Sequence, residues 1–221
     1  MNRRQLAALA VTGVFALTHN AFARMTDSAA LTNTFSVKPV TATASLTEPS
    51  WDPDEALKTV PGSVIAKDPQ IRNTSGEGIW ELAAMRIEFA YSDTCPDEEK
   101  RGKTLSTGDM QSVLAAYSID YDADRQQDEP VWRRYDGEDS SLPVQHFYYR
   151  SALDRGEATR PLFTRILVPL ETADAAFEKI RELGGFQLIV EGDVLAAADS
   201  SPDAAGNAYR QGSFVFPSES T

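Results

Sequence analysis

The sequence predicts a mainly β protein: an antiparallel β-sandwich with two short helices, preceded by a signal peptide. Period-two alternation of apolar and polar residues recurs in many short segments, two segments have helical spacing, and turn-forming residues separate several of the strands. With 221 residues, of which 42% are hydrophobic, the chain is long enough to bury a sizeable core.

Charge and residue counts exclude several classes of function. The 33 acidic residues outnumber the 21 Lys and Arg residues, which gives a net charge of −12. A chain this acidic lacks the basic face that nucleic-acid binding requires, and anionic membrane surfaces repel it. One cysteine and two histidines are too few for a Cys/His zinc cluster. We therefore expect no nucleic-acid partner.

The first 23 residues have the features of a secretory signal peptide. Two arginines precede an apolar run of twelve residues, 6–17, which is shorter than the roughly 20 residues of a membrane span. Ala21 and Ala23 fit the A-x-A cleavage pattern and predict a mature chain that begins at Arg24. A retained membrane anchor is the alternative. Cleavage lowers the net charge to −14, leaves His146 as the only histidine, and limits membrane contact to the uncleaved signal.

The segment that follows the signal, 24–38, is predicted to form an N-terminal strand. Alternate residues of this segment make an apolar face, which consists of Ala29, Leu31, Phe35 and Val37. Pro39 interrupts the alternation. We expect a β-sandwich domain over 39–199 and a polar C-terminal tail over 200–221, in which 214–216 are apolar enough to add a last short strand.

Within the sandwich domain, strands are expected at 40–47, 64–72, 85–91, 116–121, 131–135, 144–150, 162–169 and 186–191. In the strand at 85–91 apolar residues alternate with Arg86 and Glu88, which predicts one face in the core and the other toward solvent. Helical spacing of apolar residues predicts two short amphipathic helices, at 110–117 and at 173–180.

The sequence offers little for catalysis. His146 lies in a predicted strand and is expected to be structural, whereas a zinc protease of the H-E-x-x-H type needs two histidines. The chain has no G-x-S-x-G elbow and no Gly-rich phosphate loop. Cys95 and His146 would be a thiolate pair, but four acidic residues in the loop around Cys95 disfavour a thiolate. We expect no enzymatic activity and no cofactor.

One acidic stretch begins like a calcium-binding loop. Asp120, Asp122 and Asp124 have the D-x-D-x-D spacing. Arg125 stands where such a loop needs glycine, and Val131 stands where it needs a bidentate glutamate. We interpret the stretch as a solvated acidic rim. Weak calcium binding is the alternative, with the candidate ligands Asp122, Asp124, Asp128 and Glu129.

Residues 12–37 resemble the export signal that SipW-type signal peptidases process. An apolar core leads into Ala21-Phe22-Ala23, and Asp27, small residues and the strand Thr32-Asn33-Thr34-Phe35 follow. Arg24-Met25 stands where that signal usually has an aromatic residue. The resemblance implies that such a peptidase is a partner during export.

Later segments are similar to the TasA and camelysin family. The family's P-G-x-x-x-x-K…N-T stretch resembles residues 60–69 together with 71–74. Its later YY…PLF segment resembles Tyr148-Tyr149 together with 161–164, and its closing strand resembles 190–198. The resemblance implies a jelly-roll-like β-sandwich that is exported to the surface or the extracellular matrix of a Gram-positive bacterium. Family members include biofilm-matrix fibre proteins, and some were named metalloproteases.

These observations lead to a structural function. The apolar strand next to the new N-terminus can pair with the open sheet edge of a neighbouring subunit, and repeated donation gives a head-to-tail homopolymer. Matrix fibres of TasA-like proteins are built by strand donation, which implies the same role for the segment that carries Ala29, Leu31, Phe35 and Val37. Two alternatives remain: a monomeric surface-binding module whose strand folds back into its own sheet, and a camelysin-like metalloprotease.

Overall fold

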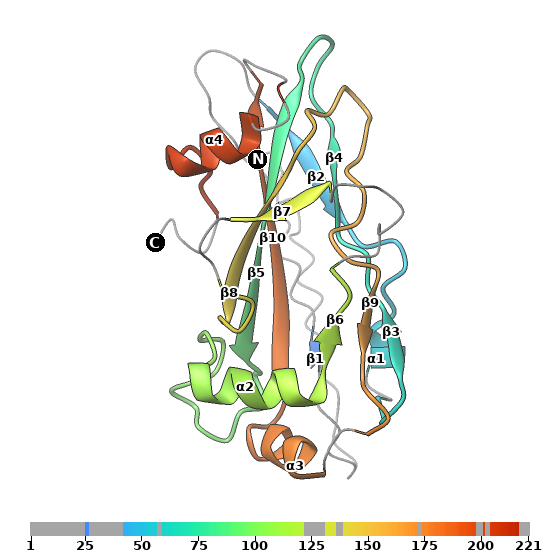
Figure 1. Ribbon diagram of the computed structural model, residues 1–221, viewed down its shortest axis with the longest axis vertical. Helices are drawn as coiled ribbons and strands as arrows, with labels where there is room; N and C mark the ends of the chain where they lie inside the picture. Colours follow the sequence, from blue (N-terminus) through green and yellow to red (C-terminus); the bar gives the residue numbers. More distant parts are fainter. Residues whose placement is uncertain are drawn as a thin grey trace, which may run out of the picture.

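The computed structural model describes residues 25–26, 42–56, 59–121, 131–135, 139–171, 174–197, 201 and 204–216. Among these described residues, strand residues outnumber helical residues, 33% against 18%, which confirms the predicted mainly β class. Two packed layers of strands run along the long axis of the molecule, and helices lie at one end and on both sides (Figure 1). Within the described residues, no helix is long and apolar enough to cross a membrane.

The first layer is a five-stranded sheet in the order β1-β10-β5-β8-β7. β5 (Glu81–Tyr91) and β10 (Phe186–Ala196) are its longest strands and pair antiparallel over their whole length. β8 (Val144–Tyr149) and the short β7 (Trp132–Arg134) continue the sheet beyond β5. On the other side, β1 (Met25–Thr26) lies parallel to the first two residues of β10.

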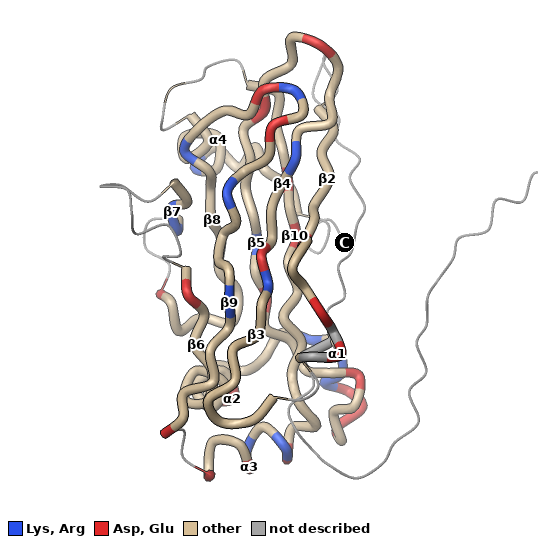
Figure 2. The backbone as a smooth tube through the Cα atoms, turned by 90° about the vertical axis from the view of Figure 1, so that its right-hand side faces the viewer, with Lys and Arg blue, Asp and Glu red and all other residues tan. Residues whose placement is uncertain are grey.

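The second layer consists of two small sheets, β2-β4 and β3-β9-β6, which lie side by side in Figure 2. Its strands are β2 (Ala44–Thr47), β3 (Val64–Ala66), β4 (Gln70–Asn73), β6 (Ser118–Ile119) and β9 (Arg165–Leu167). A backbone hydrogen bond joins the two sheets: Leu162 N, which precedes β9, donates to Pro69 O, which precedes β4. The chain crosses between the layers after β1, β4, β5, β6, β8 and β9, as in jelly-roll and Greek-key sandwiches.

The core lies between the two layers. β5 and β10 supply alternate apolar residues to it, among them Met85, Ile87, Leu188 and Val190, and the second layer supplies Ile71. At Gly192 the layers come so close that an added Cβ would lie 3.1 Å from the Ile71 side chain. The period-two pattern in the sequence therefore marks the inward face of the first layer, as predicted.

β5 is buried on both faces, whereas the sequence predicted one solvent-facing side. Arg86 and Glu88 are less than 10% exposed. The Arg86 guanidinium lies 2.7 Å from the Glu88 carboxylate and 3.1 Å from that of Glu191 on β10. Thr104 donates a further hydrogen bond to Glu88. Charged residues can occupy the centre of this sheet because they are paired with one another.

The predicted strand at 64–72 is divided into β3 and β4 because Lys67 and Asp68 bind another segment. The Lys67 ammonium is fully buried, 2.8 Å from the Glu48 carboxylate, and lies over the Trp51 ring at 4.2 Å from its centroid. The Asp68 carboxylate accepts hydrogen bonds from the amide and the hydroxyl of Ser50. These contacts attach the turn after β2 to the middle of the second layer.

Asn73 joins three segments at the end of β4. Its fully buried amide donates 2.9 Å hydrogen bonds to the carbonyls of Ile79 and Leu153, and its carbonyl oxygen accepts one from Ser75 N. Ser75 in turn donates to the buried Glu81 carboxylate. The Lys and the Asn of the P-G-x-x-x-x-K…N-T stretch therefore each have a structural role in this chain.

The two predicted helices are present, and two more accompany them. α2 (Thr107–Ala116) is capped by Ser106, and α3 (Asp174–Glu182) is followed by Gly184 in a left-handed conformation, the stop that the sequence predicts. α1 (Pro53–Ala56) is a single turn. α4 (Ala204–Arg210) lies in the predicted polar tail and packs on the outer face of the first layer (Figure 1). The expected strand at 214–216 is absent from the structure: Phe214 and Phe216 are buried without strand pairing.

Replacement of Gly184 by alanine is expected to destabilise the protein strongly. Gly184 has φ +73°, and an added Cβ would lie 2.3 Å from the Thr94 carbonyl oxygen. Gly156 is the matched control, because its φ is +77° but no atom lies within 4 Å of an added Cβ. Gly156→Ala should lower the free energy of unfolding only by the ~1–2 kcal/mol that a left-handed backbone conformation costs an alanine. Urea unfolding followed by tryptophan fluorescence should show Gly184→Ala to cost at least twice as much; equal losses would contradict the structure.

Candidate functional site

All residues to which the sequence assigned a specific role lie outside the described residues. These are the cleavage residues Ala21, Ala23 and Arg24, the strand-donation residues Ala29, Leu31, Phe35 and Val37, and the calcium candidates Asp122, Asp124, Asp128 and Glu129. The structure does describe the surface that a donated strand would need, namely the edges of the two layers.

The outer edge of β10 is the longest sheet edge in the described part of the chain. Ala197 N donates a backbone hydrogen bond to Trp80 O. Because hydrogen-bonded pairs alternate along an antiparallel ladder, the odd-numbered residues of β10 also turn their backbone groups toward β5. The even-numbered residues therefore turn their backbone groups outward. β1 adjoins this edge at Phe186 and Gln187, and the backbone groups of Val190 and Gly192 have no partner among the described residues. This open stretch is the candidate acceptor edge.

The side chains along the acceptor edge suit an amphipathic partner. Leu188, Val190 and Val194 point into the core and are each 1% exposed. On the opposite face of β10 lie polar residues, including Glu191 and Asp193. An incoming strand with one apolar and one polar face would continue both faces of the sheet.

The other edge of the first layer, β7, is built differently. It has only three residues, and Arg134 points to the core-facing side, where it lies opposite Phe147. Short edge strands and inward-pointing charges are features that prevent edge-to-edge pairing. The first layer therefore has one edge suited to accept a strand and one edge protected from doing so.

The C-terminal segment is held close to the acceptor edge. The Asp193 carboxylate accepts hydrogen bonds from Val194 N at 2.8 Å and Val215 N at 2.6 Å. Phe214 and Phe216 on either side of Val215 are buried with α4 against the outer face of the sheet. Burial raises the pKa of Asp193 to about 6, although its two backbone hydrogen bonds oppose this rise. The segment is thus tied to β10 by a carboxylate that titrates near neutral pH.

The residues considered for catalysis are separated in the structure. His146 lies in β8, as predicted, opposite Arg86, with its ring 5.4 Å from that of Tyr209 and 5.5 Å from that of Phe216. Cys95 lies beyond the far end of β5, which places it roughly 15 Å or more from His146 at ~3.4 Å per strand residue. Cys95 is 2% exposed, and its carbonyl oxygen accepts a hydrogen bond from Arg101 Nε. These two residues do not form a pair.

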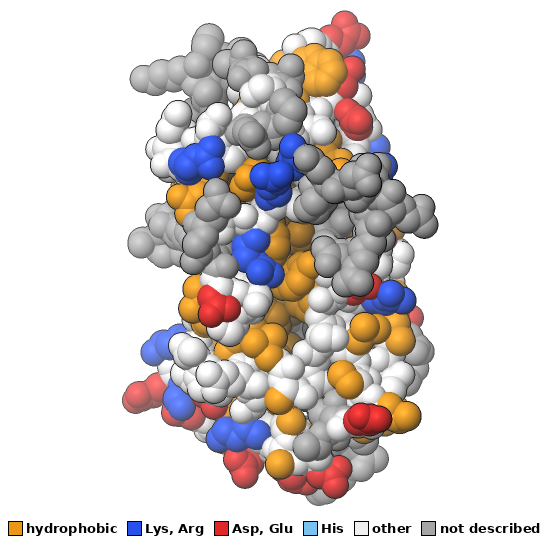
Figure 3. Space-filling model, viewed as in Figure 1, with side chains coloured by type: hydrophobic (Ala, Val, Ile, Leu, Met, Phe, Trp, Pro, Cys, Tyr) orange, Lys and Arg blue, Asp and Glu red, His pale blue; other side chains and the backbone are white. Residues whose placement is uncertain are grey.

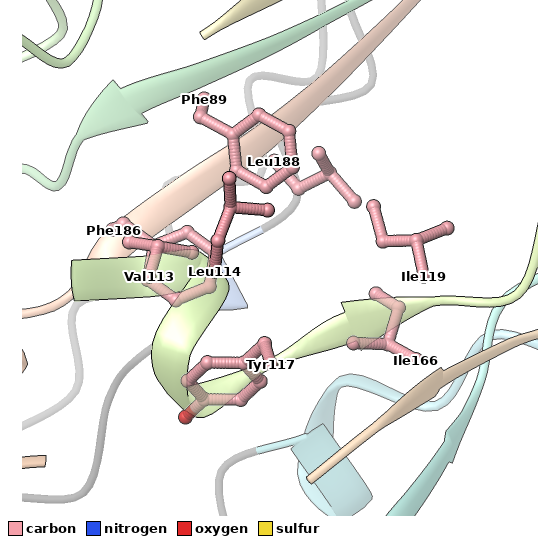
Figure 4. A pocket seen from close by; sticks show the side chains of 8 residues that line it. All are labelled: Phe89, Val113, Leu114, Tyr117, Ile119, Ile166, Phe186 and Leu188. Carbon is pink, nitrogen blue, oxygen red and sulfur yellow. The ribbon is translucent and has the colours of Figure 1, made fainter. Parts of the chain in front are cut away.

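Metal ligands and a ligand pocket were also sought within the described residues. No group of three or more His, Cys, Asp or Glu residues that could hold a metal ion is found there. Asp120, the first residue of the acidic stretch, instead forms an ion pair with Arg165 at 2.8 Å. An apolar pocket lies beside α2, between Phe89, Tyr117 and Ile166 (Figure 4), but its volume of about 10 Å³ is that of a single water molecule.

Comparison of the chain with protein-family models, with curated proteins and with solved structures finds no match.

Asp193 is expected to make the protein more stable as the pH falls from 7 to 5. Its pKa is raised to about 6 in the folded state, against about 4 in an unfolded chain, so the folded state binds a proton first. The stability that this group contributes is fully present below about pH 4 and is lost as the pH rises through 6. Between pH 7 and pH 5 the free energy of unfolding should therefore rise by ~1 kcal/mol.

Urea titrations at the two pH values test this contribution. Asp193→Asn should remove most of the rise. The control Asp139→Asn removes the same formal charge at a surface residue whose pKa is lowered by hydrogen bonds from Ser141, so it titrates below this range. An unchanged pH dependence in Asp193→Asn would show that Asp193 is not the group responsible.

Proposed function

We propose that this protein is an exported structural protein of the cell surface or the biofilm matrix, whose subunits assemble head-to-tail by donation of the segment 24–37. The observation that carries the proposal is the acceptor edge of β10, a long strand whose outer backbone groups are unpaired over Val190 and Gly192 in the described part of the chain. The sequence supplies an amphipathic segment that matches such an edge.

The two faces of the donated segment match the two faces of the edge. Its apolar residues Leu31, Phe35 and Val37 would lie beside the inward-facing side chains of β10, and its threonines and serines would continue the polar outer face. Backbone hydrogen bonds would supply an affinity that does not depend on side-chain identity, and the apolar residues would fix the register.

The difference between the two edges supports a directional polymer. If β10 accepts a strand and β7 does not, each subunit offers one acceptor edge and one donor segment. Such a contact joins two different surfaces and repeats without closing unless the rotation between subunits happens to form a ring. The resemblance to the TasA and camelysin family points to the same mode of assembly.

One observation favours the monomeric alternative. β1, at the start of the same N-terminal segment, pairs with β10 of its own chain at Phe186 and Gln187. If the rest of the segment followed this pairing, it would cover the acceptor edge and leave a monomeric surface module. The two outcomes use the same edge and differ in which chain supplies the strand.

Deletion of residues 24–37 from the mature protein should abolish filaments while leaving a folded core, because the deletion removes the donor and takes from the described sandwich only the two residues of β1. Negative-stain electron microscopy detects the filaments, and circular dichroism checks the fold. A synthetic peptide of residues 24–37 should also shorten wild-type filaments, since it occupies the acceptor edge without continuing the chain. The matched control is the same peptide with Leu31 and Phe35 replaced by lysine. Filaments that persist after the deletion exclude donation by this segment.

Assembly should increase in mildly acidic solution. The mature chain carries a net charge of −14, and protonation of carboxylates reduces the repulsion between subunits. At matched ionic strength, the intensity of scattered light should rise as the pH falls from 7 to 5. The deletion variant lacking 24–37 serves as the control for non-specific aggregation, and equal scattering from both proteins would contradict assembly through the donor segment.

A further inference from the structure

An arginine on the core-facing side of the protected edge has an unusual environment. Arg134 projects from β7 toward the second layer, and its guanidinium carbon lies 5.5 Å from the centroid of the Tyr121 ring and 5.3 Å from that of the Phe147 ring. These two rings stack at 5.2 Å, and Phe163 meets Tyr121 edge-on. The guanidinium therefore packs against aromatic rings from both layers, in cation–π contact with two of them.

Two polar atoms of this cluster lack hydrogen-bond partners in the described part of the chain. Arg134 Nε and the Tyr121 hydroxyl are both buried, and neither makes a hydrogen bond. Among the described residues no carboxylate lies within ion-pair distance of Arg134, although hydrogen bonds from Ser141 and, to a smaller extent, the positive charge of Arg134 lower the pKa of the Asp139 carboxyl. Arg86 and Arg165, in contrast, each contact carboxylates directly. A buried donor without an acceptor costs ~1–3 kcal/mol. Two such donors beside one positive charge are features of a site that binds an acceptor from outside.

We propose that Arg134 and Tyr121 form a binding site for a carboxylate group. A guanidinium presents N–H donors in a planar fork that matches the two oxygens of a carboxylate, and the Tyr121 hydroxyl is a further donor in the same cluster. The aromatic rings of the cluster can contact the apolar carbon atoms that carry the carboxylate. The net charge of −14 on the mature chain makes a more highly charged anion a poorer ligand than a single carboxylate.

On the face seen in Figure 3, hydrophobic side chains gather in a hollow between the two layers, with Lys or Arg side chains next to it. The site belongs to the β7 edge, whereas the acceptor edge is β10 at the opposite side of the sheet. The proposal therefore stands independently of strand donation. The carboxylate has two possible sources, a small free acid or an acidic side chain of a peptide segment.

The test follows the Nε–H resonance of Arg134 by NMR in the mature protein, residues 24–221. Sodium acetate is the probe for a free acid, and a blocked Gly-Glu-Gly peptide is the probe for an acidic side chain, each titrated against sodium chloride of equal ionic strength. We expect a saturable shift with at least one of the two carboxylates and none with chloride. Saturation by acetate identifies a free acid as a sufficient ligand, and saturation by the peptide alone identifies an acidic segment.

Variants separate binding from protection of the edge. Arg134→Gln should weaken carboxylate binding at least tenfold, and Tyr121→Phe should weaken it about threefold, as measured by calorimetry or by the shifts of neighbouring backbone amides. Arg155→Gln is the control, because this exposed arginine lies in a surface ion pair with Glu77. If the Arg134 resonance does not respond to either probe, or if Arg134→Gln binds as well as the wild type, the arginine only protects the edge and the proposal is wrong.

Discussion

The antiparallel pairing of β5 with β10 is the interaction on which the rest of the structure depends. It places Arg86 directly opposite Glu191 and Ile87 opposite Val190, so that one face is ionic and the other apolar. A slip by one residue would turn Glu191 into the core and leave Arg86 without its partner, which is strongly unfavourable. The register of the central pair is thus fixed by charge as well as by packing.

This register also determines what the two sides of the first layer offer. Because the odd-numbered residues of β10 bond to β5, its even-numbered residues must present their backbone groups at the outer edge, together with inward-pointing apolar side chains. At the other side, β7 is short and carries Arg134 where a core residue would be expected. Asymmetry between the two edges is therefore built into one sheet and does not require a separate binding domain.

Much of the fold could be predicted from the sequence because its inward faces follow a simple alternation. The strands around Met85 and Phe147 and the helices that contain Met110 and Ile180 are found near their predicted positions. Burial of Arg86 and Glu88 could not be predicted, because the partner Glu191 lies 105 residues away from Arg86 in the chain.

Other features were missed for different reasons. α4 is rich in small residues, so its helical spacing lacks the large apolar side chains that usually indicate an amphipathic helix; Gly206 instead lets the helix approach the Tyr148 ring. Phe214 and Phe216 were expected in a strand because they alternate, but Val215 N bonds to the Asp193 side chain in place of a neighbouring strand. The acceptor edge is a property of sheet order, which residue patterns alone do not specify.

The burial of Cys95 has a practical consequence. As the chain contains one cysteine, and this side chain is 2% exposed next to the turn that ends α3, a thiol-specific reagent can reach it only when this end of the sandwich opens. The rate of alkylation under native conditions then measures local opening directly, without an introduced label. The same rate, measured at each end of the sandwich's folding range in urea, separates local opening of this region from global unfolding.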